Sequence, residues 1–354
     1  MYNSDANKYQ LYFDQYKDFT KNSNIGSKYL TEATEVIPAD NCQILRYESF
    51  QYNSHKNKES INTMGGQRIF LIVPSFFNSP EILFLNRGRH FIDHLRDLGE
   101  VYIINWLEID NPSFSLDDYV MGVVKSLINV SKKTGKQIDL IGHCIGGNVA
   151  IAATVIRNDL VNTLTLLTSP WDFTYLDLLR PTQAFFNLDY HVRQCAIIPK
   201  LYIQILFFLL FPNYFDTKLD KYFTFTSNEE KELFFKVEHW LMSGTSLPSA
   251  TYFQLINSII GDNIQVKKDW RVNGQIIDPS LLKQPVCLIL AENDQIVPQN
   301  SILPLYKIFK KSTIVNVEGG HISYLISSKI NYLFIVYKNF LESVIYYDRK
   351  VENE

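Results

Sequence analysis

The segment 138–149, IDLIGHCIGGNV, constrains the fold of this chain more than any other. It joins a short apolar run, typical of a strand buried on both faces, to a stretch of small residues typical of a packed helix. Cys144 stands between them in GHCIGG. A turn this tight strains the backbone of its central residue, and flanking glycines avoid the clashes. The pattern predicts a nucleophile elbow with the Cys144 thiol at the carboxyl end of a sheet; the alternative is a buried structural cysteine.

Apolar strands and helices alternate along most of the chain. Parallel strands need crossover helices, and these cover both faces of the sheet. The alternation therefore predicts an α/β architecture and, together with the elbow, an α/β-hydrolase fold with a mostly parallel sheet. Strands with their loops are expected at 68–80, 100–106, 137–142, 161–170, 285–294 and 313–321, and helices at 115–135, 146–158 and 328–345.

A helical, apolar stretch interrupts this alternation, with no evident strand for some ninety residues. We expect an inserted cap at 175–264, an α/β core at 46–174 and 265–354, and an N-terminal helical segment at 1–45. Ser227 and Glu230 predict a capping box inside the cap. The apolar run at 201–211 is too short to span a bilayer. We interpret it as packed core, with a dimer interface or a hydrophobic granule as the alternatives.

Charge and cysteine usage exclude several classes of protein. The net charge is −3 and the basic residues are scattered, so no nucleic-acid partner is expected. The four cysteines share no short spacing, which argues against a zinc site and a disulfide framework; Cys42, Cys195 and Cys287 are interpreted as inert. No metal or nucleotide cofactor is indicated. The N-terminus lacks the layout of a signal peptide, so a cytoplasmic location is expected.

Two residues follow later strands in the order that an elbow enzyme needs. Such an enzyme places its acid after a later strand and its histidine after the last one. Asp294 comes directly after the strand at 285–294, and His321 follows the next strand in GGHIS. The order predicts a catalytic triad of Cys144, Asp294 and His321, with Asp172 as the alternative acid.

The residues around the triad are predicted less directly. The backbone N–H of Ile145 and one from the loop after the first core strand, at Ser75 or Phe76, are expected to bind an oxyanion. The side chain of His143 is expected to point away from the cleft, in a packing or polar-lining role. His239 is interpreted as a partly buried residue of the cap. The candidates for lining the substrate site are Asn78, His143 and Trp171.

A thiol at the elbow favours one kind of acyl transfer. Exchange of a donor thioester onto Cys144 is nearly balanced in free energy, so the acyl group stays activated, and transfer to an alcohol is then downhill. A serine would form an oxygen ester, from which transfer to another alcohol gains almost nothing. Cysteine therefore favours acyl transfer from a thioester to a hydroxyl, although some hydrolases of this fold also use cysteine.

Several motifs together resemble those of the polyhydroxyalkanoate synthases. LIGHCIGGN is similar to their cysteine-containing box, and PSFFNSPEIL to their loop after the first core strand, with Asn78 at the matching asparagine. LLTSPWDF, ENDQIVP and GGHIS are similar to further motifs of that family, in the same order. The resemblance runs from about residue 40 to 345. Ser323 departs from it, because the family usually has glycine at that place.

The resemblance implies an activity, a substrate and a partner. Hydroxyacyl groups from hydroxyacyl-coenzyme A would be joined into a polyester, with coenzyme A as substrate thioester and not as cofactor. It implies that Cys144 carries the chain, that His321 deprotonates it, and that Asp294 activates the substrate hydroxyl as well as orienting His321. The length of the chain resembles the two-subunit classes, which implies a second synthase subunit and short-chain substrates. A homodimer or hetero-oligomer, located in the cytoplasm or at polyester granules, would follow.

Two rival functions stay open at this point. The first is a cysteine-dependent hydrolase of the same fold, a thioesterase or polyester depolymerase, in which water replaces the hydroxyl acceptor. The second is a non-catalytic homologue that binds the granule surface; an intact triad argues against it.

Overall fold

The computed structural model describes residues 2–22, 28–50, 67–85, 88–176, 190–210 and 214–352. Over these residues eight strands form one sheet in the order β1-β2-β4-β3-β5-β6-β11-β12. Neighbours from β4 to β12 pair in parallel, whereas β1 and β2 join the edge in antiparallel fashion. The strands are β1 (Glu35–Pro38), β2 (Cys42–Tyr47), β3 (Arg68–Val73), β4 (Gly99–Trp106), β5 (Ile138–His143), β6 (Val161–Leu167), β11 (Val286–Ala291) and β12 (Ser312–Val317).

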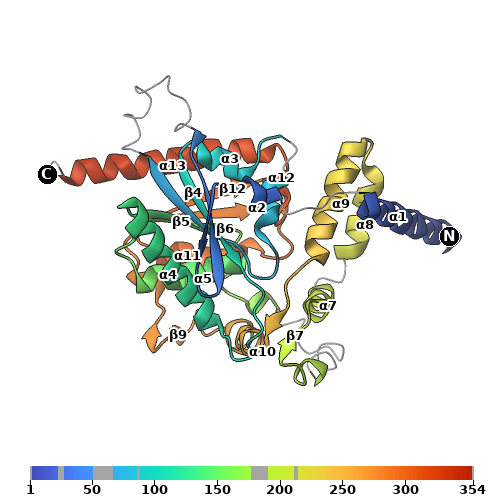
Figure 1. Ribbon diagram of the computed structural model, residues 1–354, viewed down its shortest axis with the longest axis horizontal. Helices are drawn as coiled ribbons and strands as arrows, with labels where there is room; N and C mark the ends of the chain where they lie inside the picture. Colours follow the sequence, from blue (N-terminus) through green and yellow to red (C-terminus); the bar gives the residue numbers. More distant parts are fainter. Residues whose placement is uncertain are drawn as a thin grey trace.

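Helices cover both faces of this sheet, as the alternation of strands and helices predicted (Figure 1). One face is packed by α4 (Leu116–Thr134), α5 (Ile145–Ile156) and α11 (Gln299–Ile308). The other is packed by α3 (Phe91–Arg96), α12 (Ser323–Ile326) and α13 (Lys329–Glu352). Successive strand residues contribute to opposite faces: Leu140 belongs to the first apolar cluster and Ile141 to the second. The α/β class is confirmed.

The N-terminal segment differs from the helical segment expected at 1–45. It contains α1 (Tyr2–Asn22) and α2 (Lys28–Glu32), but β1 and β2 then form a hairpin, closed by a hydrogen bond from the Ala39 N–H to the Cys42 carbonyl at 2.9 Å. The expectation was wrong for this part. β2 pairs with β4 over six residues, and this pairing with a distant strand fixes the extended conformation.

Helices dominate the chain between β6 and β11. Part of this segment was predicted to be a cap, and the limits 175–264 stay a prediction. β7 and β8 form a two-residue antiparallel pair that the sequence did not indicate. The elements are η4 (Thr174–Leu176), β7 (Ile197–Ile198), α7 (Lys200–Leu210), α8 (Tyr214–Thr224), α9 (Asn228–Met242), β8 (Leu247–Pro248), α10 (Ser249–Phe253), η5 (Gln254–Gly261), β9 (Arg271–Val272), β10 (Gln275–Ile276) and η6 (Pro279–Leu281). A further short helix, η3 (Pro80–Phe84), follows β3.

We call α7, α8 and α9 the cap helices. They lie beside the core, and α1 packs on their outer side, against α8 and α9 (Figure 1). α9 begins at the predicted capping box: Ser227 Oγ accepts from the Glu230 N–H at 3.2 Å, and the Glu230 carboxylate accepts from the Ser227 N–H at 3.3 Å. α7 carries most of the apolar run at 201–211, and its two faces differ. Ile203 belongs to the core cluster, whereas Leu201 is 59% exposed.

Among the residues that the structure describes, every helix is too short or too polar to cross a bilayer.

Candidate active site

Cys144 occupies the turn between β5 and α5 in the strained conformation that the sequence predicted. Its φ is 53° and its ψ is −132°, a combination that side chains rarely adopt. The Cys144 N–H donates to the Leu167 carbonyl at 3.0 Å, which ties the turn to the neighbouring strand. Gly146 must lack a side chain, because a Cβ there would lie 2.5 Å from the Pro74 carbonyl oxygen. Gly146 thus lets the loop after β3 approach the elbow closely.

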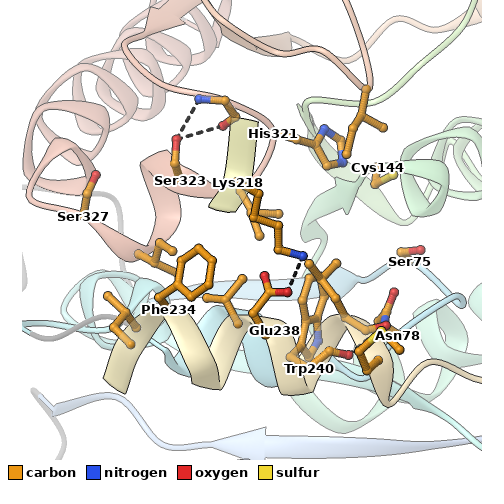
Figure 2. A pocket seen from close by; sticks show the side chains of 18 of the residues that line it. Ser75, Asn78, Cys144, Lys218, Phe234, Glu238, Trp240, His321, Ser323 and Ser327 are labelled. Carbon is orange, nitrogen blue, oxygen red and sulfur yellow. Dashed lines mark hydrogen bonds and ion pairs between the residues drawn. The ribbon is translucent and has the colours of Figure 1, made fainter. Parts of the chain in front are cut away.

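The structure brings the three residues of the predicted triad together. His321 Nδ1 lies 2.8 Å from Asp294 Oδ2, and its ring lies beside the Cys144 side chain (Figure 2). Figure 2 shows the Cys144 and His321 side chains beside each other at one wall of a cavity. The other carboxylate oxygen, Asp294 Oδ1, accepts from the N–H groups of Ile296 at 2.9 Å and Val297 at 2.8 Å. Asp294 therefore holds His321 from a rigid loop.

The alternative acid, Asp172, is engaged elsewhere. Its Oδ1 accepts from the Asn263 amide at 2.8 Å and from the Thr174 N–H at 3.0 Å. Since His321 Nδ1 is paired with Asp294, the geometry favours Asp294 as the partner of the histidine.

The surroundings of His321 favour its protonated form. Burial by itself lowers the pKa of the imidazole, because charge is poorly solvated there. The negative charges of Cys144 and Asp294, and hydrogen bonds to both, outweigh burial and raise the pKa of His321 to about 10. His321 is therefore held in its imidazolium form beside Cys144 at neutral pH.

His143 does not point away from the cleft, so that expectation was wrong. It lines the cavity together with Cys144, and its ring centroid lies 5.8 Å from that of His321, with 27° between the ring planes. As the last residue of β5 it shares a face with Ile141, and the loop carrying His321 crosses this face. Burial, and secondarily the charge of His321, lower the pKa of His143 to about 3, so its imidazole is neutral.

The groups predicted to bind an oxyanion lie at the same wall. Ile145 is the first residue of α5, where an N–H has no acceptor within the helix. Ser75 lines the cavity, and its Oγ accepts from the Phe77 N–H at 3.2 Å. Phe76 is buried and stacks on Tyr119 at a centroid distance of 4.3 Å. Which of these N–H groups acts stays a prediction.

Four hydrogen bonds tie the loop after β3 to the end of α9 and the residues after it, one of them from the Asn78 amide to the Leu241 carbonyl at 3.3 Å. The Asn78 amide donates to the Trp240 carbonyl at 2.9 Å, and the Trp240 indole N–H donates to the Ser79 carbonyl at 2.8 Å. The Thr245 N–H donates to the Phe77 carbonyl at 2.8 Å. Sequence reasoning missed Trp240, although a tryptophan at the end of a predicted cap helix marked it for attention.

The cavity has a volume of about 990 Å³ and lies between the core and the cap helices. Asn78, a candidate for lining the substrate site, lines this cavity, and apolar residues such as Phe207, Phe234 and Trp240 form the cap side. Lys218 and Glu238 face it as an ion pair (Figure 2). A cavity of this size, with a few polar groups in apolar walls, is typical of a small-molecule site.

Trp171, Ser323 and His239 complete the predicted residues. Trp171 is fully buried in the core and is not among the described residues that line the cavity. Ser323, at the place of the family's glycine, begins α12, and its Oγ accepts from the Gly320 N–H at 2.7 Å. It therefore fits an ordinary backbone and steadies the loop of His321. His239 is half-buried on α9.

The remaining cysteines are free thiols, and Cys42 and Cys287 are fully buried. Burial raises the pKa of Cys42 to about 11, and it also raises the pKa of Cys287. Both thiols are thus held in the unreactive, protonated form.

The sequence matches the family described as alpha/beta hydrolase fold over residues 117–327, more than half of its length. The chain belongs to the α/β-hydrolase-fold family. Among solved structures, a membrane phospholipase A described as a bacterial virulence factor superposes with a TM-score of 0.51 at 15% identity. That match covers 89% of this chain and 87% of the other, and it concerns the fold alone.

Curated relatives indicate which group of proteins with this fold the chain resembles. The poly(3-hydroxyalkanoate) polymerase subunit PhaC of Haloarcula marismortui is 26% identical over 274 residues, which cover 73% of this chain and 57% of that protein. The protein of the same name from Synechocystis sp. is 26% identical over 282 residues, which cover 73% of each. The chain thus spans little more than half the length of the Haloarcula relative. The resemblance that the motifs indicated is confirmed.

Proposed function

We propose that this chain is the catalytic subunit of a polyhydroxyalkanoate synthase. It would transfer hydroxyacyl groups from coenzyme A thioesters to the hydroxyl end of a growing polyester. The observation that carries the proposal is a cysteine at the elbow, paired with His321 and Asp294 beside an apolar cavity, in a chain whose curated relatives are named poly(3-hydroxyalkanoate) polymerase subunits.

In the first step the Cys144 thiolate attacks the carbonyl carbon of the hydroxyacyl thioester. The N–H of Ile145, with one from the loop after β3, would stabilise the oxyanion that forms. The carbon–sulfur bond to coenzyme A breaks, and the imidazolium of His321 gives its proton to the leaving thiolate. The raised pKa of His321 supports this order, since the proton is already on the histidine before the attack.

In the second step a hydroxyl group attacks the acyl–Cys144 thioester. His321, now neutral, accepts the hydroxyl proton, an ester forms, and Cys144 leaves as a thiolate. The thiolate–imidazolium pair is thereby restored. Replacing a thioester by an oxygen ester is downhill, which is the thermodynamic reason for a thiol at this elbow.

The geometry favours an orienting role for Asp294 over the base role that the family resemblance implied. Both of its carboxylate oxygens hold hydrogen bonds, and its side chain is 1% exposed. Asn293 and Gln295 line the cavity, but Asp294 is not among the described residues that do so. A substrate hydroxyl therefore meets His321 before it meets Asp294.

The wider assembly belongs to the same proposal. A second synthase subunit, a homodimeric or hetero-oligomeric state and contact with polyester granules follow from the family resemblance. An exposed apolar side chain on α7, that of Leu201, supports such contacts.

The test is to supply the purified chain with 3-hydroxybutyryl-coenzyme A, to follow thiol release and to identify the acyl product. We expect an insoluble polyester that yields 3-hydroxybutyrate only on alkaline hydrolysis. Free 3-hydroxybutyrate formed in step with thiol release would instead identify a thioesterase. Inactivity both alone and with a candidate partner subunit would contradict the proposal.

Substitution of the nucleophile sharpens this test. Cys144→Ser is expected to lose more than about 100-fold in turnover while keeping the melting temperature, because the intermediate becomes an oxygen ester. Cys195→Ser, at a half-buried thiol outside the site, is the matched control and should keep full activity. A serine variant as fast as the parent would refute the argument for the thiol.

A further inference from the structure

The side-chain hydroxyl of Ser75 lies at the wall of the active-site cavity. Ser75 and Cys144 both line this cavity, and Figure 2 shows their side chains on the same side of it. Ser75 is only partly buried, and its side chain consists of one carbon and the hydroxyl group. A molecule bound in the cavity can therefore reach the hydroxyl.

The strand register places Ser75 beside the nucleophile. β3 and β5 pair in parallel, with Val73 opposite Gly142. Ser75 and Cys144 each come two residues after this pair, so the chain carries them to the same level at the carboxyl ends of neighbouring strands, which lie about 4.8 Å apart. A Cβ on Gly146 would lie 2.4 Å from the Val73 carbonyl oxygen, so the segment leading to Ser75 also contacts the first turn of α5. The hydroxyl is thus near the place where an acyl group on Cys144 would lie.

The Ser75 hydroxyl has a hydrogen atom that it can donate. Its Oγ accepts from the Phe77 N–H at 3.2 Å, which uses one of the two lone pairs. Within the part of the chain that the structure describes, no group accepts the hydroxyl hydrogen of Ser75. A neutral donor beside a nucleophile suits an oxygen atom that gains negative charge during the reaction, because donors placed in this way stabilise the transition state.

We propose that the Ser75 hydroxyl is a catalytic group, which donates a hydrogen bond to the acyl carbonyl oxygen when this oxygen becomes negative. As the Cys144 sulfur bonds to the carbonyl carbon, an electron pair of the carbon–oxygen double bond moves to the oxygen. Ser75 Oγ–H donates to this oxygen and keeps its proton, and the double bond re-forms when the leaving group departs. The inference rests on the proposed acyl transfer and adds a side-chain donor to the backbone N–H groups expected there.

A purely structural role is the alternative, because the same oxygen accepts from the Phe77 N–H and holds the loop. Three substitutions separate the two roles. Ser75→Ala removes both the acceptor and the donor. Ser75→Asp keeps an acceptor, since a carboxylate also accepts from the N–H two residues further on, but it has no donor. Ser75→Thr keeps both.

The reaction to measure is the first turnover with butyryl-coenzyme A, which has no hydroxyl group and therefore acylates Cys144 once. We expect Ser75→Ala to lower the rate constant of thiol release by at least about 10-fold, with the half-saturating concentration within about twofold of the parent. Ser75→Asp should be slower still, because its negative charge repels the oxyanion, and Ser75→Thr should stay within about threefold. A rate constant in Ser75→Ala or Ser75→Asp within about twofold of the parent would overturn the proposal.

Alkylation of Cys144 by iodoacetamide is the matched control. It forms a carbon–sulfur bond and releases iodide without placing charge on an oxygen, so Ser75→Ala should keep the alkylation rate within about twofold. Peptide mass spectrometry follows Cys144 separately from Cys195, which is also half-buried. An equal loss of alkylation and acylation would overturn the proposal, since the hydroxyl would then act on the thiolate itself.

A binding measurement separates this inference from the proposed function. Trifluoromethyl propyl ketone has no leaving group, and its carbonyl carbon bonds to the Cys144 thiolate to form a stable tetrahedral oxyanion. Fluorine NMR gives the dissociation constant of this adduct, which should rise by at least about 10-fold in Ser75→Ala. Equal dissociation constants, or no adduct with the parent chain, would refute the inference, even in a chain that proves to have no synthase activity. Failure of butyryl-coenzyme A to acylate Cys144 would contradict only the proposed function.

Discussion

The core and the cap bury their side chains in different ways. The core strands β3, β5 and β11 are buried along their whole length, between two large clusters made mainly of aliphatic residues. The outer part of the cap, where α1 meets α8 and α9, is centred on four buried residues, Tyr12, Leu219, Tyr222 and Phe235. Three of the four are aromatic, and the Tyr222 and Phe235 ring centroids lie 5.1 Å apart.

Charge is also buried differently in the two regions. In the core, Asp139 receives two hydrogen bonds from Arg68 at 2.7 Å and one each from Asn162 and Thr163 at 2.8 Å. In the cap, Glu238 pairs with Lys218, and the Tyr12 hydroxyl approaches it at 3.4 Å. The outer cap rests on a much smaller buried cluster than the core, which makes local opening of the cap cheaper than unfolding of the core.

The largest expected difference concerns one histidine in each region. His321→Gln should lower turnover by about 10³-fold or more, because the proton donor and acceptor of both steps is lost. His239→Gln, on the cap, should keep turnover within about twofold. Steady-state thiol release measures both variants, and equal losses would mean that the cap takes part in the chemistry directly.

The buried pair at the base of the sheet should dominate the stability of the core. Arg68→Met leaves the Asp139 carboxylate buried without its cation, and we expect a loss of about 4 kcal/mol in the free energy of unfolding. Arg157→Met removes a cation from a more exposed pair with Asp159 and should cost less than about 1 kcal/mol. Chemical denaturation gives both values; a small loss for Arg68→Met would contradict the assigned role.

A cavity created by substitution in the cap should destabilise the cap helices and leave the core sheet unchanged. Phe235→Ala removes the ring at the centre of the aromatic cluster, at a cost of about 3 kcal/mol to the packing of α1, α8 and α9. We expect faster proteolysis and amide exchange in these helices, with the exchange of β5 and β6 unchanged. Phe13→Ala, at an exposed ring of α1, is the control. Loss of protection in the strands as well would show that cap and core unfold together.

The pH dependence of thiol release should distinguish His321 from His239. His321 has a raised pKa, so the stabilisation by its imidazolium is fully present below about pH 6.5, the value of a free histidine, and is lost as the pH rises through about 10. Thiol release in the first turnover should fall about tenfold per pH unit above pH 10. Burial, and secondarily Lys200, lower the pKa of His239, so it stays neutral throughout this range. A fall centred near pH 6.5 would contradict this account.

The smallest expected effect lies at the junction of the two regions. Trp240→Phe removes the indole N–H that donates to the Ser79 carbonyl and should cost about 1 kcal/mol. Trp270→Phe is a matched control, since the buried indole N–H of Trp270 has no partner within the described residues. Both variants lose the same ring volume, so Trp270→Phe should be the less destabilised of the two by about 1 kcal/mol. Thermal melting compares the two variants. Equal shifts in melting temperature would mean that the hydrogen bond from Trp240 to the Ser79 carbonyl adds no stability.

The sequence could predict those parts of the site that depend on chain order. The elbow is a local pattern, and Asp294 and His321 each follow a strand whose apolar run is easily recognised. The side of the sheet that His143 faces depends on which loop crosses it, and that is decided by tertiary packing. Trp171 follows a strand in the same manner as Asp294, yet its indole packs into the core. β1 and β2 are separated by helix-breaking residues, Pro38, Asp40 and Asn41, which the prediction of a helical segment did not take into account, and pairing with β4 fixes their extended conformation.

The ties between the loop after β3 and the end of α9 have a consequence for wasteful side reactions. The loop after β3 is expected to supply an oxyanion donor. Hydrogen bonds of Asn78, Trp240 and Thr245 join this loop to the end of α9, which lines the cavity. If α9 moved away from the cavity to admit a substrate, the loop after β3 would move with it, and its oxyanion donor would leave its aligned position. Bulk water that entered the open cleft would then find the thioester without its oxyanion donor. An acyl enzyme waiting for its acceptor would therefore be hydrolysed slowly until α9 returned.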